Sequence, residues 1–291
     1  MTDYPSYQAY PGSTPDLITP PTILVAAADP APQNRFTVFF RLILIVPHAI
    51  VLFFLGIAVV VVAFIGWWGA LFTARLPQFA VNFLSGCLRW WTRVYAYSAL
   101  LTDVYPPFTL GDAPTYPVRV AIPEPQRLNR AAVFFRFILI IPANILLSVV
   151  SAGAGIVSLI AWLVTLFTGR LPASFHLAFV AVLRFETRFY GYQAMLTTTY
   201  PGGLYGDKPG TVAWADAPAP NRGGPTPGYG MEPASRPVSW LLPLTSAAKV
   251  LVTVFIVLGA IGVIASDVYN IESNHSTLNN NGASTTSVVI G

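Results

Sequence analysis

The stretch VFFRLILIVP at residues 38–47 decides how this chain is organised, because it occurs twice. The second copy, VFFRFILIIP, occupies residues 133–142, which is 95 residues further along. At the same offset, LFTARLP at residues 71–77 corresponds to LFTGRLP at residues 166–172. The chain is therefore a tandem duplication of one unit, and both copies are expected to fold alike.

The composition argues against a water-soluble chain. Of the 291 residues, 54% are hydrophobic and only 10% are charged, whereas soluble domains carry about 25% charged residues. The formal net charge is only +4, so the position of each arginine matters more than the total. The single cysteine, Cys87, has no partner for an internal disulfide and is expected to fill space in the core. These features predict a membrane protein.

Residues 36–74 form an almost wholly apolar run that is too long to cross a bilayer upright as one helix. Such a helix would measure roughly 58 Å, against a hydrocarbon layer of about 30 Å. Either the segment before Pro47 lies at the interface and residues 46–72 span, or the run breaks near Gly56 and re-enters. We favour the first arrangement, because proline commonly kinks helices and Arg41 prefers the headgroup level.

The second helix of each unit is ambiguous. Residues 78–101 place Arg89 and Arg93 one turn apart, and the second copy repeats this pair. An arginine at the centre of a spanning helix costs about 2.5–3.5 kcal/mol. The helix therefore either spans steeply with snorkelling arginines or lies flat as an amphipathic helix. We favour the steep span.

Topology follows from the number of crossings in each unit. Two crossings keep both copies in the same orientation, whereas one crossing inverts the second copy. With two crossings, only Arg75 and Arg170 lie on the side opposite the other arginines, and the arginine-rich side is cytoplasmic. The expectation is a multi-pass protein of the cell membrane with five spans, a cytoplasmic N-terminus and an external C-terminus.

The composition divides the chain into six parts. They are a disordered Tyr/Pro-rich tail (1–21), membrane repeat 1 (22–116), membrane repeat 2 (117–214), a Pro/Gly-rich linker (215–238), a C-terminal transmembrane helix (239–266) and a polar tail (267–291).

Three short segments rich in β-formers suggest strands at residues 23–28, 118–122 and 211–214. They either pair into a small sheet on one side of the membrane or remain extended linkers, and both alternatives stay open. The predicted fold class is an all-α polytopic membrane protein with two tandem two-helix repeats, a C-terminal transmembrane helix and, on the first alternative, this small sheet.

Four motifs carry a resemblance to a known family: Arg41 with Pro47-His48, residues 71–77, Arg89-Trp90 with Arg93 and Tyr97, and residues 101–108. Together they resemble the bacterial membrane family described as domain of unknown function 4389, in two copies over about residues 23–207. The resemblance implies the fold and no activity, because the family has none assigned.

Copy two departs from that pattern in three places: Ala143 replaces His48, Glu186 replaces Trp91, and residues 198–202 lack both the acidic residue and the second proline of the first copy, with Thr198 in place of Asp103. Any role that needs His48 or Asp103 therefore belongs to copy one alone. Because copy two lacks both, we expect them to be dispensable for folding.

No residue pattern indicates catalysis. The histidines are far apart in the expected topology, and the sequence has no metal-ligand spacing, no nucleophile elbow and no glycine-rich nucleotide loop. We therefore predict no catalytic residues, no metal, no cofactor and no enzyme activity.

The arginines are the strongest functional candidates. Guanidinium groups beside hydrocarbon need partners, and their two-pronged geometry suits phosphate. We expect anionic lipid headgroups to bind six of them: Arg41, Arg89, Arg93, Arg136, Arg184 and Arg188. The alternative is that these arginines only anchor the helices and set the topology.

The favoured function is a non-catalytic scaffold or accessory subunit that contacts membrane lipids and docks a protein through its Pro-rich tails. A transporter or channel built from two parallel repeats and a lipid-modifying enzyme are the alternatives. Nucleic acid is not an expected partner, because the basic residues lie close to the membrane.

Overall fold

The computed structural model describes residues 22–206, 238–239 and 242–286. Repeat 1 contributes helices α1 (Arg35–Thr73) and α2 (Gln78–Ser98). Repeat 2 contributes α3 (Arg130–Phe134), α4 (Arg136–Leu139), α5 (Ile141–Thr168) and α6 (Ala173–Gln193), and α7 (Ser246–Thr286) follows. The expected tail at residues 1–21 and nearly all of the expected linker at residues 215–238 lie outside the described residues.

The two repeats begin and end their first helices in the same way. The side chain of Asn34 caps α1 by accepting from the backbone N–H of Phe36, and Asn129 caps α3 in the same manner. Ala74 after α1 and Gly169 after α5 both adopt the left-handed conformation, with φ of 57° and 72°. The duplication read from the sequence is therefore present in the backbone.

The first helix is continuous in repeat 1 and broken in repeat 2. α1 runs through Pro47, whereas the equivalent Pro142 stands in the first turn of α5. A proline is tolerated in a first turn, where the missing N–H has no helical partner. Phe135 separates the short helices α3 and α4, and Ile140 separates α4 from the long helix α5.

The small sheet exists. Strands β1 (Leu24–Ala28), β2 (Val118–Ala121) and β3 (Val238–Ser239) form an antiparallel sheet in the order β2-β1-β3. Two of the three expected strands are confirmed by β1 and β2. The third candidate at residues 211–214 lies outside the described residues, and β3 takes the remaining edge of β1 instead.

An internal pseudo-two-fold axis relates the repeats. Val25 pairs with Val120, its own equivalent, at the centre of the β1–β2 ladder. The hydroxyl of Thr92 on α2 lies 3.3 Å from that of its equivalent Thr187 on α6. A residue that touches its own equivalent lies at a two-fold axis, so one axis passes through the sheet and between α2 and α6.

The equivalent long helices run antiparallel. At one end, the N–H of Gln33 donates to the carbonyl of Gly169, and at the other, Leu128 donates to Ala74. The start of α1 therefore lies beside the end of α5, and the end of α1 lies beside the start of α3. The expectation that both copies share one orientation is wrong. The helix-free connection at residues 99–129, which contains β2, returns the chain along the bundle before repeat 2 begins.

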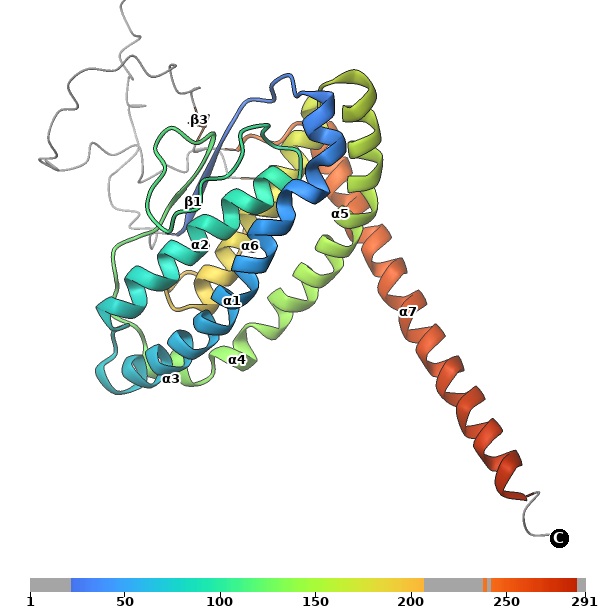
Figure 1. Cartoon of the computed structure of the whole chain (residues 1–291). Coiled ribbons are helices and arrows are strands. Elements are labelled where there is room, and N and C mark those ends of the chain that lie inside the picture. Colours follow the sequence, from blue (N-terminus) through green and yellow to red (C-terminus); the bar gives the residue numbers. More distant parts are fainter. Residues whose placement is uncertain (1–21, 207–237, 240–241, 287–291) are drawn as a thin grey trace, which may run out of the picture.

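The molecule is layered along the axis (Figure 1). The sheet packs on α2 and α6, and these two helices pack on α1 and α5. α6 is central, and every residue from 178 to 189 is buried. α1, by contrast, exposes large apolar side chains along its whole length, from Phe36 to Phe72. Such an apolar exterior indicates membrane association.

Within the described residues, three helical segments are long and apolar enough to cross a membrane: residues 35–73, 136–168 and 246–270. α2 and α6 are not among them, so the five expected spans reduce to three candidates. α7 packs against α5 so closely that a Cβ on Gly153 would meet the carbonyl of Phe255 at 1.8 Å. α7 also continues as a helix to Thr286, past the expected boundary at Ser266.

Candidate functional site

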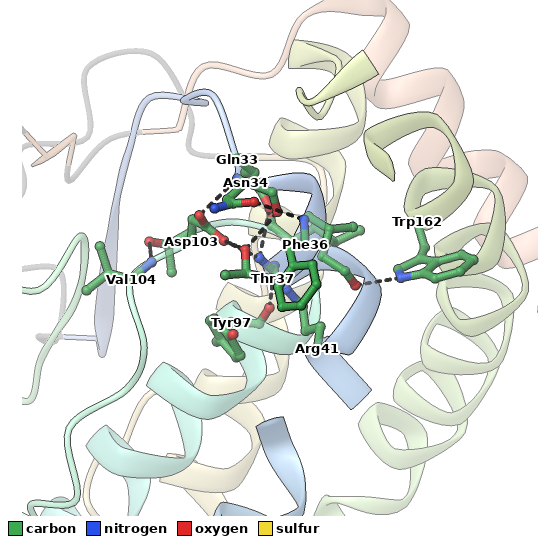
Figure 2. A network of polar contacts seen from close by, with 12 residues as sticks. Gln33, Asn34, Phe36, Thr37, Arg41, Tyr97, Asp103, Val104 and Trp162 are labelled. Carbon is green, nitrogen blue, oxygen red and sulfur yellow. Dashed lines mark hydrogen bonds and ion pairs between the residues drawn. The ribbon is translucent and has the colours of Figure 1, made fainter. Parts of the chain in front are cut away.

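A buried polar cluster surrounds Arg41 of α1 (Figure 2). The Arg41 guanidinium donates to the Tyr97 carbonyl at 2.9 Å, to the Gln33 side chain at 3.0 Å and to Asp103 at 2.9 Å. It also lies 4.5 Å from the centre of the Tyr97 ring. Arg41 is only 2% exposed, so these internal partners compensate for its lost hydration.

Asp103 binds the start of α1 in this cluster. Besides Arg41, it accepts hydrogen bonds from the backbone N–H of Asn34 at 3.0 Å and from the hydroxyl of Thr37. These donors belong to the start of α1, so Asp103 fixes α1 rather than capping the end of α2. With three donors on one carboxylate, Asp103 is poorly placed to act as a general base.

His48 lies in an aromatic pocket of repeat 1. It stacks on Phe108 with 3.9 Å between ring centres, and its Nδ1 accepts from the Trp90 indole at 3.3 Å. His48 is fully buried. The structure therefore gives both His48 and Asp103 a packing role, against the expectation that folding does not need them.

Arg136 is the equivalent of Arg41 and has fewer partners. Its Nη1 donates to the Tyr192 carbonyl, its guanidinium lies 4.2 Å from the Tyr192 ring centre, and it is 4% exposed. The positions equivalent to Asp103 and Gln33 hold Thr198 and Leu128. Among the described residues no carboxylate lies within 4.0 Å of Arg136, and its Nε has no hydrogen-bond partner.

The other four predicted arginines bind within the protein. Arg93 and Arg188 donate to backbone carbonyls of the loops that cover α2 and α6. Arg89 forms a 2.9 Å ion pair with the exposed Asp112, and Arg184 is buried. Five of the six predicted arginines are thus buried, and their binding of lipid phosphate stays a prediction.

Tyr116 fastens the loop that follows α2. Its hydroxyl donates to the Val104 carbonyl at 3.1 Å, and the side chain is buried. Burial raises the pKa of the Tyr116 hydroxyl, which therefore stays protonated and keeps its donor role across the physiological pH range.

Four exposed arginines occupy the two ends of the α1–α5 pair. Arg35 and Arg170 lie at one end, and Arg130 and Arg75 lie at the other. With two crossings in each unit, Arg75 and Arg170 were expected on the side of the membrane opposite the other arginines. The two-fold relation instead gives each end one arginine from each repeat.

A groove of about 680 Å³ lies between α1, α2, α4 and α6. Its wall is mostly aliphatic and aromatic and includes Gly56, Trp67, Leu84 and Trp91. Arg136 lines it and is its one charged side chain. The groove could not be predicted from the sequence, because only the antiparallel packing of the two repeats brings its walls together.

Comparison with known proteins supports the duplication. The family model described as "Domain of unknown function (DUF4389)" matches residues 35–109 and again residues 130–204. Searches among curated proteins and among solved structures found no match. In the part of the chain that the structure describes, no group of three or more His, Cys, Asp or Glu side chains could hold a metal ion. Because the two matches cover more than half of its length, this chain belongs to the DUF4389 family, whose domain it carries in two tandem copies.

Proposed function

We propose that this protein is a non-catalytic membrane scaffold or accessory subunit that lies in one leaflet of the bilayer and contacts anionic lipid headgroups. The observation that supports it most is the layering along the pseudo-two-fold axis. Apolar helices α1 and α5 form one side of the body, and the sheet with its connecting loops forms the other.

The direction of the axis decides between spanning and lying in the membrane. If the antiparallel helices α1 and α5 crossed the bilayer, the axis would lie in the membrane plane and the sheet would sit at mid-depth. That position would bring Arg119 of β2 and the exposed Asp112 to the bilayer centre. A central arginine costs about 2.5–3.5 kcal/mol, and open sheet edges do not occur in hydrocarbon.

An axis along the membrane normal avoids both costs. The sheet then faces water, and α1 and α5 lie along the membrane with their exposed apolar side chains among the acyl chains. The exposed arginines at both helix ends come to one level, where phosphate groups are found. The sheet side is then the cytoplasmic side indicated by the arginines, and we propose a cytoplasmic N-terminus.

α7 then supplies the membrane crossing. Its contacts with the body end near Gly259, and Figure 1 shows it leaving on the side away from the sheet. Its apolar residues 250–266 extend roughly 25 Å, close to the thickness of the hydrocarbon layer. We therefore propose an external C-terminus.

The alternatives are weaker. A transporter of two parallel repeats does not agree with antiparallel equivalent helices. A lipid-modifying enzyme would need Asp103 or His48, and both are engaged in packing. A protein partner that binds the Pro-rich tails stays a prediction, because the tails lie outside the described residues.

Cysteine accessibility tests the arrangement. Gln78 and Ala173 are equivalent, exposed residues at the starts of α2 and α6. We would place a cysteine at each in a Cys87→Ser background and label intact cells and inverted vesicles with an impermeant maleimide. The proposal expects both to react only in inverted vesicles. One cysteine reacting from each side would show that α1 and α5 cross the bilayer, and the proposal would fail.

Headgroup contact is tested by replacing the four exposed arginines at the ends of α1 and α5 together. We expect the quadruple Arg→Gln variant of Arg35, Arg75, Arg130 and Arg170 to retain fewer phosphatidylglycerol molecules than the wild type in native mass spectrometry. The matched quadruple Arg→Lys variant keeps the charge and should retain most of them. Equal retention by the glutamine variant would remove headgroup contact from the proposal.

A further inference from the structure

We infer that the groove beside Arg136 binds one amphiphile, with an anionic head on the Arg136 guanidinium and a hydrocarbon chain between α1 and α2. The head is a phosphate or a carboxylate, so the ligand is an anionic phospholipid or a fatty acid. This inference rests on the proposed contact with membrane lipid and gives it a specific site.

The charge of Arg136 points to an anion. The buried Arg41 is neutralised by Asp103, but the equivalent Arg136 has no carboxylate within 4.0 Å among the described residues. The positions equivalent to Asp103 and Gln33 hold the uncharged residues Thr198 and Leu128. An uncompensated buried charge is costly. A bound anion would supply the missing partner, and guanidinium geometry suits both phosphate and carboxylate.

The groove has the size and lining for a chain. Its volume of about 680 Å³ falls within the 300–1,000 Å³ typical of small-molecule sites. Phe53, Phe64 and Phe137 line it and are more than half exposed. They belong to the apolar exterior of the body, so the groove opens where acyl chains are available.

The other repeat shows what fills such a groove. Leu52, Leu55 and Val59 line the groove and are only partly buried or exposed, whereas their equivalents Leu147, Val150 and Ala154 are buried.

On that side α7 supplies the cover, since its Phe255 stacks on Phe179, the equivalent of the groove residue Leu84, at 5.5 Å. Thus α7 covers the equivalent groove beside Arg41, the arginine that is paired with the carboxylate of Asp103. The open groove lies beside Arg136, which has no carboxylate within 4.0 Å among the described residues.

Native mass spectrometry of the full chain tests the inference. Detergent-purified protein is titrated separately with phosphatidylglycerol, oleate, phosphatidylcholine and monoolein. We expect one tight adduct with phosphatidylglycerol or with oleate, and the tighter of the two identifies the source of the anion. The zwitterionic and neutral lipids should bind at least about tenfold more weakly, because they do not neutralise Arg136.

Two variants address the head and the chain without removing a buried arginine. Thr198→Asp gives Arg136 the carboxylate that Arg41 has and should weaken the adduct about tenfold or more. Gly56 lines the groove, and a Cβ added there would meet no atom within 4 Å, so Gly56→Trp can be accommodated and fills the groove. We expect Gly56→Trp to abolish the adduct. Gly155→Trp is the matched control, since it is equally open and does not line the groove.

The outcomes are separable from those of the proposed function. Unchanged binding by Thr198→Asp or Gly56→Trp overturns the inference, and so does an equal effect of Gly155→Trp. A dimer in which Gly56→Trp blocks association would show that a second copy fills the groove instead. The results of cysteine labelling and of the exposed-arginine variants do not depend on lipid binding in the groove, so they test the proposed function separately.

Discussion

Removing the carboxylate of Asp103 should destabilise the protein far more than removing the equivalent hydroxyl of Thr198. Asp103→Ala deletes three accepted hydrogen bonds and leaves Arg41, 2% exposed, without its counter-ion. Breaking a buried ion pair from one side costs about 3–5 kcal/mol. The Asp103 side chain is 27% exposed, so water can reach part of the site, and we expect about 3 kcal/mol.

The control is Thr198→Ala, which loses one hydrogen bond to Gln126 and should cost about 0.5–1.5 kcal/mol. The measurement is the free energy of unfolding in mixed micelles by titration with SDS. Adding Arg41→Met to Asp103→Ala should restore part of the loss, since the unpaired charge is gone. If Asp103→Ala costs no more than Thr198→Ala, the cluster around Arg41 does not hold α1 in place and the reasoning is wrong.

Three further predictions use the same assay or simple cross-linking. His48→Ala should cost about 2–4 kcal/mol and change tryptophan fluorescence, because it empties a fully buried aromatic pocket; a cost near zero would contradict this packing role. Gly153→Leu should separate α7 from α5 and abolish a disulfide cross-link between them, whereas Gly155→Leu, whose Cβ meets no atom within 4 Å, should not. Arg89→Gln should lower stability by less than about 1 kcal/mol, because its carboxylate partner is 68% exposed; a larger loss would show that this ion pair is structural.

Local features of the fold could be predicted from the sequence, but the arrangement of the repeats could not. The repeat offset, the apolar run at residues 36–74 and two of the strands follow from pattern alone. The antiparallel relation depends on the connection at residues 99–129, which returns along the bundle without a helix. The uneven distribution of arginines favoured two crossings in each unit and therefore copies in the same orientation, and the antiparallel packing of α1 and α5 shows that this relative orientation is wrong.

The candidate site could be predicted only in part, because much of it depends on tertiary packing between distant residues. Arg41 and Arg136 were identified as equivalent, and copy two was seen to lack the acid. That Asp103 neutralises Arg41 could not be predicted, because the two residues are 62 positions apart and meet only through tertiary packing. The groove depends on contacts between both repeats, so no pattern within one repeat could predict it.

The contacts at the pseudo-two-fold axis have a consequence for the origin of the fold. Val25 meets Val120 and Thr92 meets Thr187, so each repeat offers its neighbour the surface that it also receives. Such a self-complementary surface is what a symmetric homodimer uses. A single repeat expressed alone should therefore pair with a second identical chain. In a covalent fusion the two halves need not be identical, and here only repeat 1 has the acid Asp103 while α7 packs against α5 and α6 of repeat 2.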